Sequence, residues 1–223
     1  MQHDATQGLF IVLEGIDGAG TTTQLAALAR EFRARGRDVH TTREPSDGPV
    51  GTLLRLMMRG RVSSPSGAPG WETMALLFAA DRMDHLDSEI DPFLAKGGVI
   101  ISDRYDASSI AYQSCSSTSA SAVAFIREIN RHARRPDLTI VVDVPSHVAE
   151  LRRAARGGAP ELYEKTELQT KLAAFYRELS AHMPGDPIVV VSGEGAPSEV
   201  TTRILEALSR EIPAEKLRFS APA

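Results

Sequence analysis

The chain has 223 residues, of which 42% are apolar, 24% charged and 5% aromatic. That composition suits a folded globular protein and excludes a wholly disordered chain. The formal net charge is −4, so the sequence lacks the basic surplus typical of nucleic-acid-binding proteins. No apolar run approaches the ~20 residues that cross a bilayer, and the first eight residues do not read as a secretory signal. Because Cys115 has no second cysteine to pair with, we expect a cytoplasmic protein without membrane or nucleic-acid partners.

Apolar runs and helical spacing alternate along the chain, which is typical of α/β proteins. Short apolar runs predict strands over residues 9–14, 38–42, 99–102, 137–144 and 187–191. Apolar residues three and four positions apart predict helices from Thr22 and over residues 49–59, 71–90, 108–113, 121–132, 146–156, 161–181 and 197–210. Asp91-Pro92 should end or bend the helix over 71–90, because a residue before proline avoids the helical region. The alternation predicts a parallel sheet with helices on both faces.

A glycine-rich segment, GIDGAGTTTQ, follows the first predicted strand and leads into a helix. Its Gly15, Gly20 and Thr22 match the phosphate-loop pattern G-x-x-x-x-G-K-[ST] in type and spacing. Glycines let successive backbone N–H groups surround a phosphate, and the helix N-terminus adds positive potential. The Thr22 hydroxyl would then bind Mg²⁺. The expected phosphate-binding residues are Gly15, Ile16, Asp17, Gly18, Ala19, Gly20, Thr21, Thr22 and Thr23.

The lysine of the phosphate-loop pattern is replaced by Thr21, and the nearest lysine along the sequence is Lys96. A glycine-rich turn that caps a helix and binds no ligand is therefore the alternative interpretation of this segment.

Several segments in order resemble the thymidylate kinase family, over roughly residues 8–210. They are FIVLEGIDGAGTTTQ (10–24), TREP (42–45), LLFAADRMDH (76–85), ISDRYDASSIAYQ (101–113) and RPDLTIVVDVP (135–145). The resemblance implies a P-loop NTPase-type, three-layer α/β fold: a five-stranded parallel sheet flanked by helices, with a small lid, in one domain over 8–210. Residues 211–223 are expected to form a flexible tail. The resemblance also implies a homodimeric, Mg²⁺-dependent kinase that uses ATP to convert dTMP to dTDP in dTTP synthesis.

Charged residues follow the second and third predicted strands, where ligands of open parallel sheets bind. Arg43 suits an acceptor phosphate, as the resemblance also implies, and a surface ion pair with Glu44 is the alternative. Asp103 is placed to hold Mg²⁺ together with Thr22, with a helix cap as its alternative. Arg104 can bridge the donor and acceptor phosphates.

Phe78 and Arg82 are four residues apart and share one face of a helix. The resemblance implies that Phe78 stacks on thymine and that Arg82 bonds to thymine O4, whereas core packing is the alternative for Phe78. Asp81 and Asp84 are expected on a solvated face. The resemblance further implies that Tyr105 crowds the 2′ position of the sugar. It implies a nucleoside pocket that also includes Ser109, Tyr112 and Gln113.

A lid is predicted over residues 151–165, where Arg153 and Arg156 precede a Gly-Gly pair. Arginines so placed can swing onto a transferring phosphate, and a solvated basic stretch is the alternative. The resemblance implies that adenine binds at residues 192–197. It also implies that Asp17 accepts the proton of the 3′-hydroxyl of the monophosphate.

The loss of the lysine bears directly on the predicted activity. One preorganised donor to developing charge contributes about 2.7–4 kcal/mol to a transition state, whereas a well-placed arginine is worth roughly 10³–10⁵ in rate. Thr21 therefore predicts either a slow kinase or one whose lid arginines replace the lysine. A non-catalytic nucleotide-binding protein is one alternative, and a kinase for another nucleotide, dUMP included, is a second.

Overall fold

The structure is a computed structural model that describes residues 8–63, 69–156, 163 and 166–217. Strands and helices alternate from the first strand onward, as the sequence predicts. The elements in chain order are β1 (Leu9–Glu14), α1 (Thr21–Ala34), β2 (Val39–Arg43), α2 (Pro49–Met58), α3 (Trp71–His85), the π-helical turn η1 (Leu86–Ile90), α4 (Asp91–Leu94), β3 (Val99–Asp103), α5 (Asp106–Ser116), α6 (Ala122–Ile129), β4 (Leu138–Asp143), α7 (Ser146–Arg156), α8 (Thr166–Arg177), α9 (Leu179–His182), β5 (Ile188–Ser192), α10 (Pro197–Glu211) and α11 (Ala214–Leu217).

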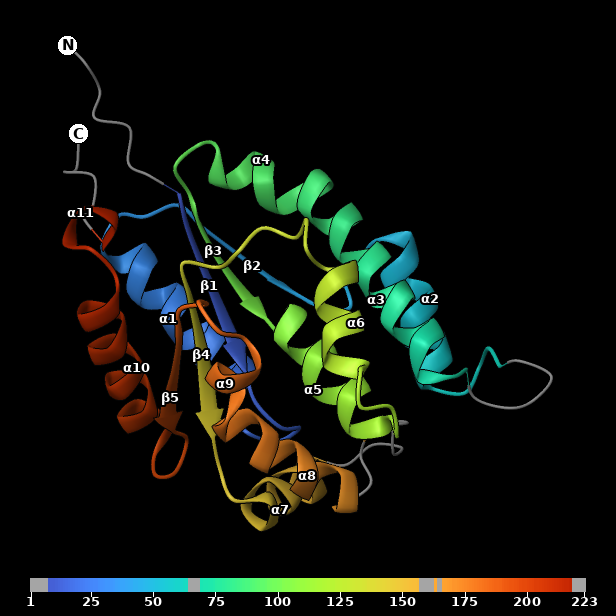
Figure 1. Cartoon of the computed structure of the whole chain (residues 1–223). Helices are drawn as coiled ribbons and strands as arrows, with labels where there is room; N and C mark the ends of the chain where they lie inside the picture. The colour runs from blue at the N-terminus through green and yellow to red at the C-terminus, as the bar shows by residue number, and fades with distance from the viewer. Residues whose placement is uncertain (1–7, 64–68, 157–162, 164–165, 218–223) are drawn as a thin grey trace.

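The five strands form one parallel sheet in the order β2-β3-β1-β4-β5, which confirms the predicted α/β class and the five-stranded sheet. Helices cover both faces (Figure 1): α1 and α10 lie side by side on one of them, and α3, α4, α5 and α6 lie on the other. Among the described residues, no helix is long and apolar enough to cross a membrane.

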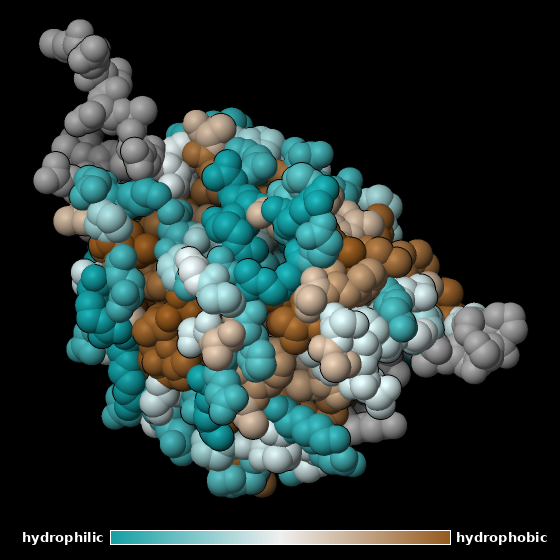
Figure 2. All heavy atoms as spheres, viewed as in Figure 1, coloured by the Kyte–Doolittle hydropathy of each residue, from teal (hydrophilic) through white to brown (hydrophobic). Residues whose placement is uncertain are grey.

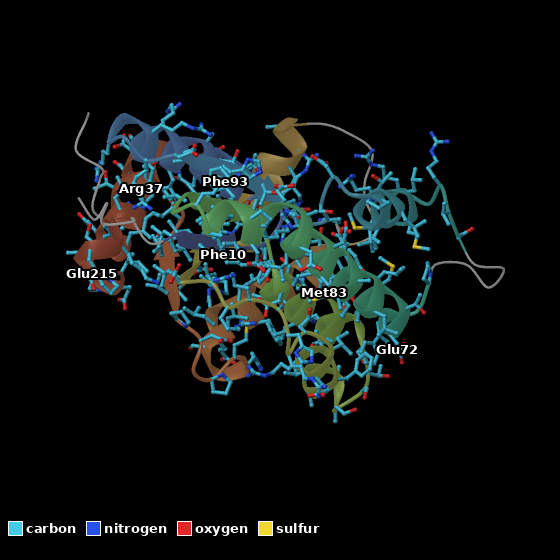
Figure 3. The ribbon with its side chains drawn as sticks, turned by 90° about the horizontal axis from the view of Figure 1, so that it is seen from above. Phe10, Arg37, Glu72, Met83, Phe93 and Glu215 are labelled. Atoms are coloured by element: carbon cyan, nitrogen blue, oxygen red, sulfur yellow. The ribbon has the colours of Figure 1, made fainter. Side chains whose placement is uncertain are left out.

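The residues of β1 alternate between two hydrophobic clusters, because successive side chains of a strand point to opposite faces. Leu9, Ile11 and Leu13 pack in the cluster that includes α1 and α10. Phe10 and Val12 pack with the helical run from η1 to α4 in the second cluster. Figure 3 shows Phe10 in the interior of the ribbon. All six residues of β1 are buried, as expected for a central parallel strand.

The register of the strands brings three strand ends level with one another. Leu13 of β1 pairs with Asp103 of β3, and Arg43 of β2 pairs with the same Asp103. Consequently the loop after β1 and the residues that follow β2 and β3 leave the sheet at one edge. Figure 1 shows α7 and α8 beside this carboxyl edge.

An element boundary falls at Asp91-Pro92, since η1 ends at Ile90 and α4 begins at Asp91, although the helical run continues from α3 through η1 into α4. One expectation about a segment end is corrected. Part of the predicted tail is helix α11, which Lys216 holds in place. Its ammonium group lies 2.5 Å from Asp137, and its carbonyl oxygen accepts a hydrogen bond from Arg37. Residues 218–223 lie outside the described part of the chain.

The expectation that Asp81 is solvated is wrong, whereas Asp84 is exposed as predicted. Asp81 is fully buried on α3 and accepts two hydrogen bonds from Ser46, one from its backbone N–H at 2.8 Å and one from its hydroxyl at 2.6 Å. Asp81 therefore fastens the β2–α2 loop to α3.

We expect Asp81→Ala to lower the free energy of unfolding by about 1–3 kcal/mol, because it leaves two buried Ser46 donors without an acceptor. Urea denaturation followed by circular dichroism measures the change. Asp84→Ala removes the neighbouring exposed carboxylate of the same helix and should change stability by less than about 0.5 kcal/mol. Equal losses in the two variants would contradict the assigned role of Asp81.

Candidate active site

A cavity of about 240 Å³ opens at the carboxyl edge of the sheet. Ten residues that the sequence analysis selected line it, although they come from separate segments. They are Asp17, Arg43, Phe78, Arg82, Asp103, Arg104, Tyr105, Ser109, Tyr112 and Gln113. Five other lining residues were not predicted from the sequence: Glu44, Pro45, Met58, Ser108 and Tyr163.

The glycine-rich loop has the backbone geometry of a phosphate loop. Gly18 and Gly20 have φ angles of 91° and 101°, a region that disfavours side chains. A Cβ at Gly18 would also lie 2.4 Å from the carbonyl oxygen of Ala149 on α7, so only glycine lets α7 approach the loop this closely. Helix α1 begins directly after Gly20 and directs its N-terminus at the loop.

Thr22 and Asp103 meet across the loop and the end of β3. The Thr22 hydroxyl donates a hydrogen bond of 2.6 Å to the Asp103 carboxylate. The other Asp103 carboxylate oxygen, Oδ1, is buried and has no hydrogen-bond partner. Mg²⁺ prefers oxygen ligands and is often held by one carboxylate together with substrate phosphates. The oxygens of Thr22 and Asp103 fit such an ion. Among the described residues, no group of three or more His, Cys, Asp or Glu side chains is arranged to hold a metal.

Arginines of α7 contact the phosphate loop from outside. Arg152, for which the sequence suggested no ligand role, donates hydrogen bonds to the carbonyl oxygens of Ala19 (3.0 Å) and Gly193 (3.1 Å). Arg153 donates to the carbonyl oxygen of Asp17. Thr21 is buried at the start of α1. The side chain of Arg156 and most of the predicted lid lie outside the described residues.

Arg104 is the only described residue other than glycine with a positive φ angle, 76°. Such a conformation costs about 1–3 kcal/mol and persists only where surrounding contacts hold it. Its guanidinium donates to the Gly15 carbonyl oxygen at 3.1 Å and to the Asp17 carboxylate at 2.6 Å. The strained backbone therefore directs a cation back over the phosphate loop.

Arg43 lines the same cavity and is largely exposed. Its ion pair is with Asp47, at 2.9 Å, and not with Glu44. The side chains of both partners are more than half exposed, so the pair contributes little to stability and leaves Arg43 accessible to a ligand. The alternative that Arg43 pairs with Glu44 is thus wrong.

Glu44 instead pairs with Arg82 in the interior. The two side chains are 2% and 1% exposed, and their nearest atoms lie 2.6 Å apart. Arg82 also donates hydrogen bonds to Ser109 and Asn130. A buried arginine fixed by three partners can present its remaining donor edge to a ligand without losing further conformational freedom.

Aromatic side chains form the walls around these arginines. Phe78 is half-buried and faces the cavity, so it is not a core residue. The ring of Tyr105 is buried edge-on against Phe10, with the Arg82 guanidinium 5.0 Å from its centroid. Tyr163 contacts the ring of Tyr112 edge-on. The expected contact of Tyr105 with a sugar remains a prediction, since its hydroxyl is buried.

A second cleft, of about 260 Å³, lies on the other side of the phosphate loop. This cleft is lined by the loop, by the first turn of α1, and by the β5–α10 turn with the start of α10. Arg152 also borders it. The other lining residues are Ala19, Gly20, Thr23, Gln24, Gly193, Gly195, Pro197 and Val200. The cleft therefore includes the turn where the sequence analysis expected adenine.

Glu14, the last residue of β1, is a buried carboxylate directly before the loop. Burial raises its pKa from the ordinary value of 4.5 to about 7, and the nearby Arg104 together with hydrogen bonds from Ser108, Tyr105 and Tyr176 partly opposes that rise. In the sequence, Glu14 reads as the end of an apolar strand and suggests no role. The one available hint is that a single carboxylate ends a run of apolar residues.

Glu14 should make the stability of the fold depend on pH. Because its pKa is higher in the folded than in the unfolded chain, the folded chain binds more protons and loses stability as the pH rises from about 4.5 through 7. At 1.36 kcal/mol per pKa unit, the expected loss between pH 4 and pH 8 is about 3 kcal/mol.

The loss is measured as the difference between the wild-type chain and Glu14→Gln in denaturant unfolding across that pH range. The variant keeps the shape of the side chain and removes its titration, so contributions of other carboxylates cancel. A difference that stays constant from pH 4 to pH 8 would show that Glu14 does not titrate in this range.

Comparisons with known proteins agree with this geometry. Residues 13–204 match the family model described as thymidylate kinase. The chain is 42% identical to a probable thymidylate kinase of Pyrococcus abyssi, over 78% of this chain and 83% of that protein. It is 37% identical to a probable thymidylate kinase of Pyrobaculum aerophilum, over 91% and 97% of the two chains. It is also 37% identical to a thymidylate kinase of Rhizorhabdus wittichii, over 92% and 99%. With a phosphate loop, strand-end arginines and family-wide similarity in one chain, this protein belongs to the thymidylate kinase family.

Proposed function

We propose that this chain is a thymidylate kinase, which transfers the γ-phosphoryl group of ATP to dTMP and releases dTDP and ADP for dTTP synthesis. The observation that carries the proposal is a single cavity lined by Asp17 of the phosphate loop, the arginines Arg43 and Arg104, and the pair Phe78 and Arg82. The cavity thus combines cations for an acceptor phosphate with an aromatic surface and a donor edge for a pyrimidine.

The acceptor nucleotide binds with its phosphate between Arg43 and Arg104 and its base against Phe78. Arg82, held by Glu44, donates to the thymine O4 atom. Further contacts to the nucleoside come from the β3–α5 segment and from the phosphate loop. Asp17 accepts a hydrogen bond from the 3′-hydroxyl, and the pocket wall comprises Tyr105, Ser109, Tyr112 and Gln113.

The donor nucleotide binds with its phosphates in the loop from Gly15 to Thr23 and its adenine in the second cleft. Thr22 and Asp103 are the residues that would hold Mg²⁺, which neutralises phosphate charge when it is bound. The attacking phosphate oxygen is ionised at neutral pH, so the reaction needs no general base. The site has to position two phosphates and to offset their charge.

Arginines supply the positive charge that the lysine of the phosphate-loop pattern supplies in other proteins. Neither cleft is lined by a lysine among the described residues. Arg104 and Arg153 both bond to oxygens of the loop, and together with Arg156 they stabilise the transferring phosphoryl group. An impaired or non-catalytic nucleotide-binding protein remains the second candidate function, because Thr21 is buried at the lysine position.

An assay that couples ADP release to a colour change tests the proposal with dTMP, dUMP, dCMP, dGMP and dAMP. We expect the highest kcat/KM with dTMP and the next highest with dUMP, which lacks only the methyl group. No turnover above background with dTMP, using folded protein, rejects the proposed activity. Retained dTMP binding in calorimetry would then favour the non-catalytic candidate.

A Thr21→Lys variant separates the two candidates within the same assay. A gain in kcat of roughly 10²-fold or more would mean that the native loop is impaired, because one donor to developing charge has about that value. We expect little change or a loss, because the loop already has arginine partners.

We also propose a homodimer that forms through α2 and α3. Leu76 and Met83 lie seven residues apart on α3 and are 52% and 38% exposed, and Leu56 on the adjacent α2 is 40% exposed. Figure 3 shows Met83 on the ribbon of α3, and Figure 2 shows brown apolar surface where α2 and α3 lie in Figure 1. Exposed apolar groups gathered in this way are typical of interfaces.

Light scattering coupled to gel filtration checks this arrangement. We expect the wild-type chain to have the mass of two chains and Leu76→Glu/Met83→Glu to have the mass of one. Leu151→Glu, which changes a 69% exposed leucine on α7, should stay dimeric. A monomeric wild-type chain contradicts the dimer, and a dimeric double variant contradicts the face.

A further inference from the structure

We propose that Glu14, Ser108 and Tyr176 form a directional hydrogen-bond chain that positions Arg104 for the acceptor phosphate. This inference rests on the proposed function only for the identity of the phosphate. The three residues come from β1, α5 and α8, and two of them, Glu14 and Tyr176, are at most 1% exposed. We name them the Glu14 chain.

Four donors converge on the Glu14 carboxylate. One oxygen, Oε1, accepts hydrogen bonds from the backbone N–H groups of Tyr105 (2.8 Å) and Ser108 (3.1 Å). The other oxygen, Oε2, accepts from the hydroxyl groups of Ser108 (2.6 Å) and Tyr176 (2.9 Å). Since backbone N–H groups can only donate, Oε1 carries no proton, and Oε2 is an acceptor for both hydroxyls whenever Glu14 is ionised.

The two hydroxyls then have their single protons committed to Glu14. Each hydroxyl keeps lone pairs, and the Arg104 guanidinium donates to both, at 3.1 Å to Ser108 and 3.4 Å to Tyr176. An arginine has donors and no acceptor, so it can bond to these hydroxyls only while their lone pairs face it. Glu14 therefore sets the direction of the hydrogen bonds in the Glu14 chain: Arg104 donates to the two hydroxyls, and the hydroxyls donate to the carboxylate.

This arrangement explains how a strained residue is held. The positive φ angle of Arg104 turns its side chain toward the loop, where one nitrogen, Nη1, also contacts the Gly15 carbonyl and the other, Nη2, contacts Asp17. When it is ionised, Glu14 supplies a buried negative charge next to that cation, and Arg104 in turn lowers the pKa of Glu14. The Glu14 chain thus holds the Arg104 guanidinium, whose position over the loop is set before a phosphate binds.

Tyr176 connects this arginine to the segment after the predicted lid. It is on α8, and Gln169, an earlier residue of the same helix, donates a hydrogen bond of 2.9 Å to the Asp17 carboxylate. A shift of α8 would therefore move the support of Arg104 and that of its partner Asp17 together.

Tyr176→Phe tests the chain because it removes one hydroxyl and keeps the ring. We expect the Kd and the KM for dTMP to rise about 3- to 10-fold, as for the loss of one ordinary hydrogen bond, and the KM for ATP to change less than about 2-fold. In an Arg104→Gln background, Tyr176→Phe should have no further effect on dTMP binding. Ser108→Ala should act in the same way as Tyr176→Phe.

The matched control is Ser209→Ala, which removes a helical serine hydroxyl that bonds only within α10. It should leave both KM values unchanged. An unchanged Kd for dTMP in both Tyr176→Phe and Ser108→Ala overturns the inference. So does an equal loss with and without Arg104. If Tyr176→Phe does not fold, Ser108→Ala decides by itself.

Two measurements without nucleotide separate this inference from the proposed function. Titration of ¹³C-labelled Glu14 by NMR should give a higher midpoint in Tyr176→Phe, since a donor to the carboxylate is lost. Crystal structures of the wild-type chain and the variant should differ in the place or order of the Arg104 guanidinium. If the wild-type chain binds no dTMP, the proposed function fails, and an unmoved Arg104 in the variant crystal still overturns the inference.

Discussion

The parallel pairing of β2, β3 and β1 is the constraint on which the site depends. Parallel strands end at the same edge of a sheet, and the register places Arg43 and Leu13 on either side of Asp103. The glycine-rich loop, an exposed arginine and the Asp103-Arg104 pair therefore leave the sheet together. Ligands of open α/β sheets bind at this edge for the same geometric reason. Antiparallel pairing of any of these strands would separate the groups by the length of a strand.

Charge balance at this edge differs from that of an ordinary phosphate loop. The loop has no lysine, and arginines from α7 and from the end of β3 bond to its carbonyl oxygens and to Asp17. Two carboxylates offset these arginines: Glu44 pairs with the buried Arg82, and Glu14, when it is ionised, lies near the partly exposed Arg104. A buried charge is tolerated only with such a partner. The cations thus keep fixed positions in a site that has to receive two nucleotides.

Much of the fold could be predicted from local patterns, whereas most residues of the candidate site were expected from the resemblance to a known family. Five apolar runs became five strands, and the residues expected around a nucleotide, from Asp17 to Gln113, line one cavity. The errors arose where a polar residue has a distant partner. Asp81 reads as an exposed helical carboxylate, yet it holds Ser46. The alternative pairing of Arg43 with Glu44 failed for the same reason, because Glu44 pairs with Arg82. Local spacing does not encode such partners.

The sequence by itself determined the α/β class, the position of a glycine-rich loop between strand and helix, and the types of residue that follow each strand, because strand and helix periodicity and glycine spacing are local properties. Only the tertiary structure decided which cation lies over the loop and which carboxylate supports it. Glu14, Ser108 and Tyr176 are separated by up to 162 positions along the chain and meet through packing of β1, α5 and α8. The orientation of a hydrogen-bond network depends on all its members at once, and no single segment contains that information.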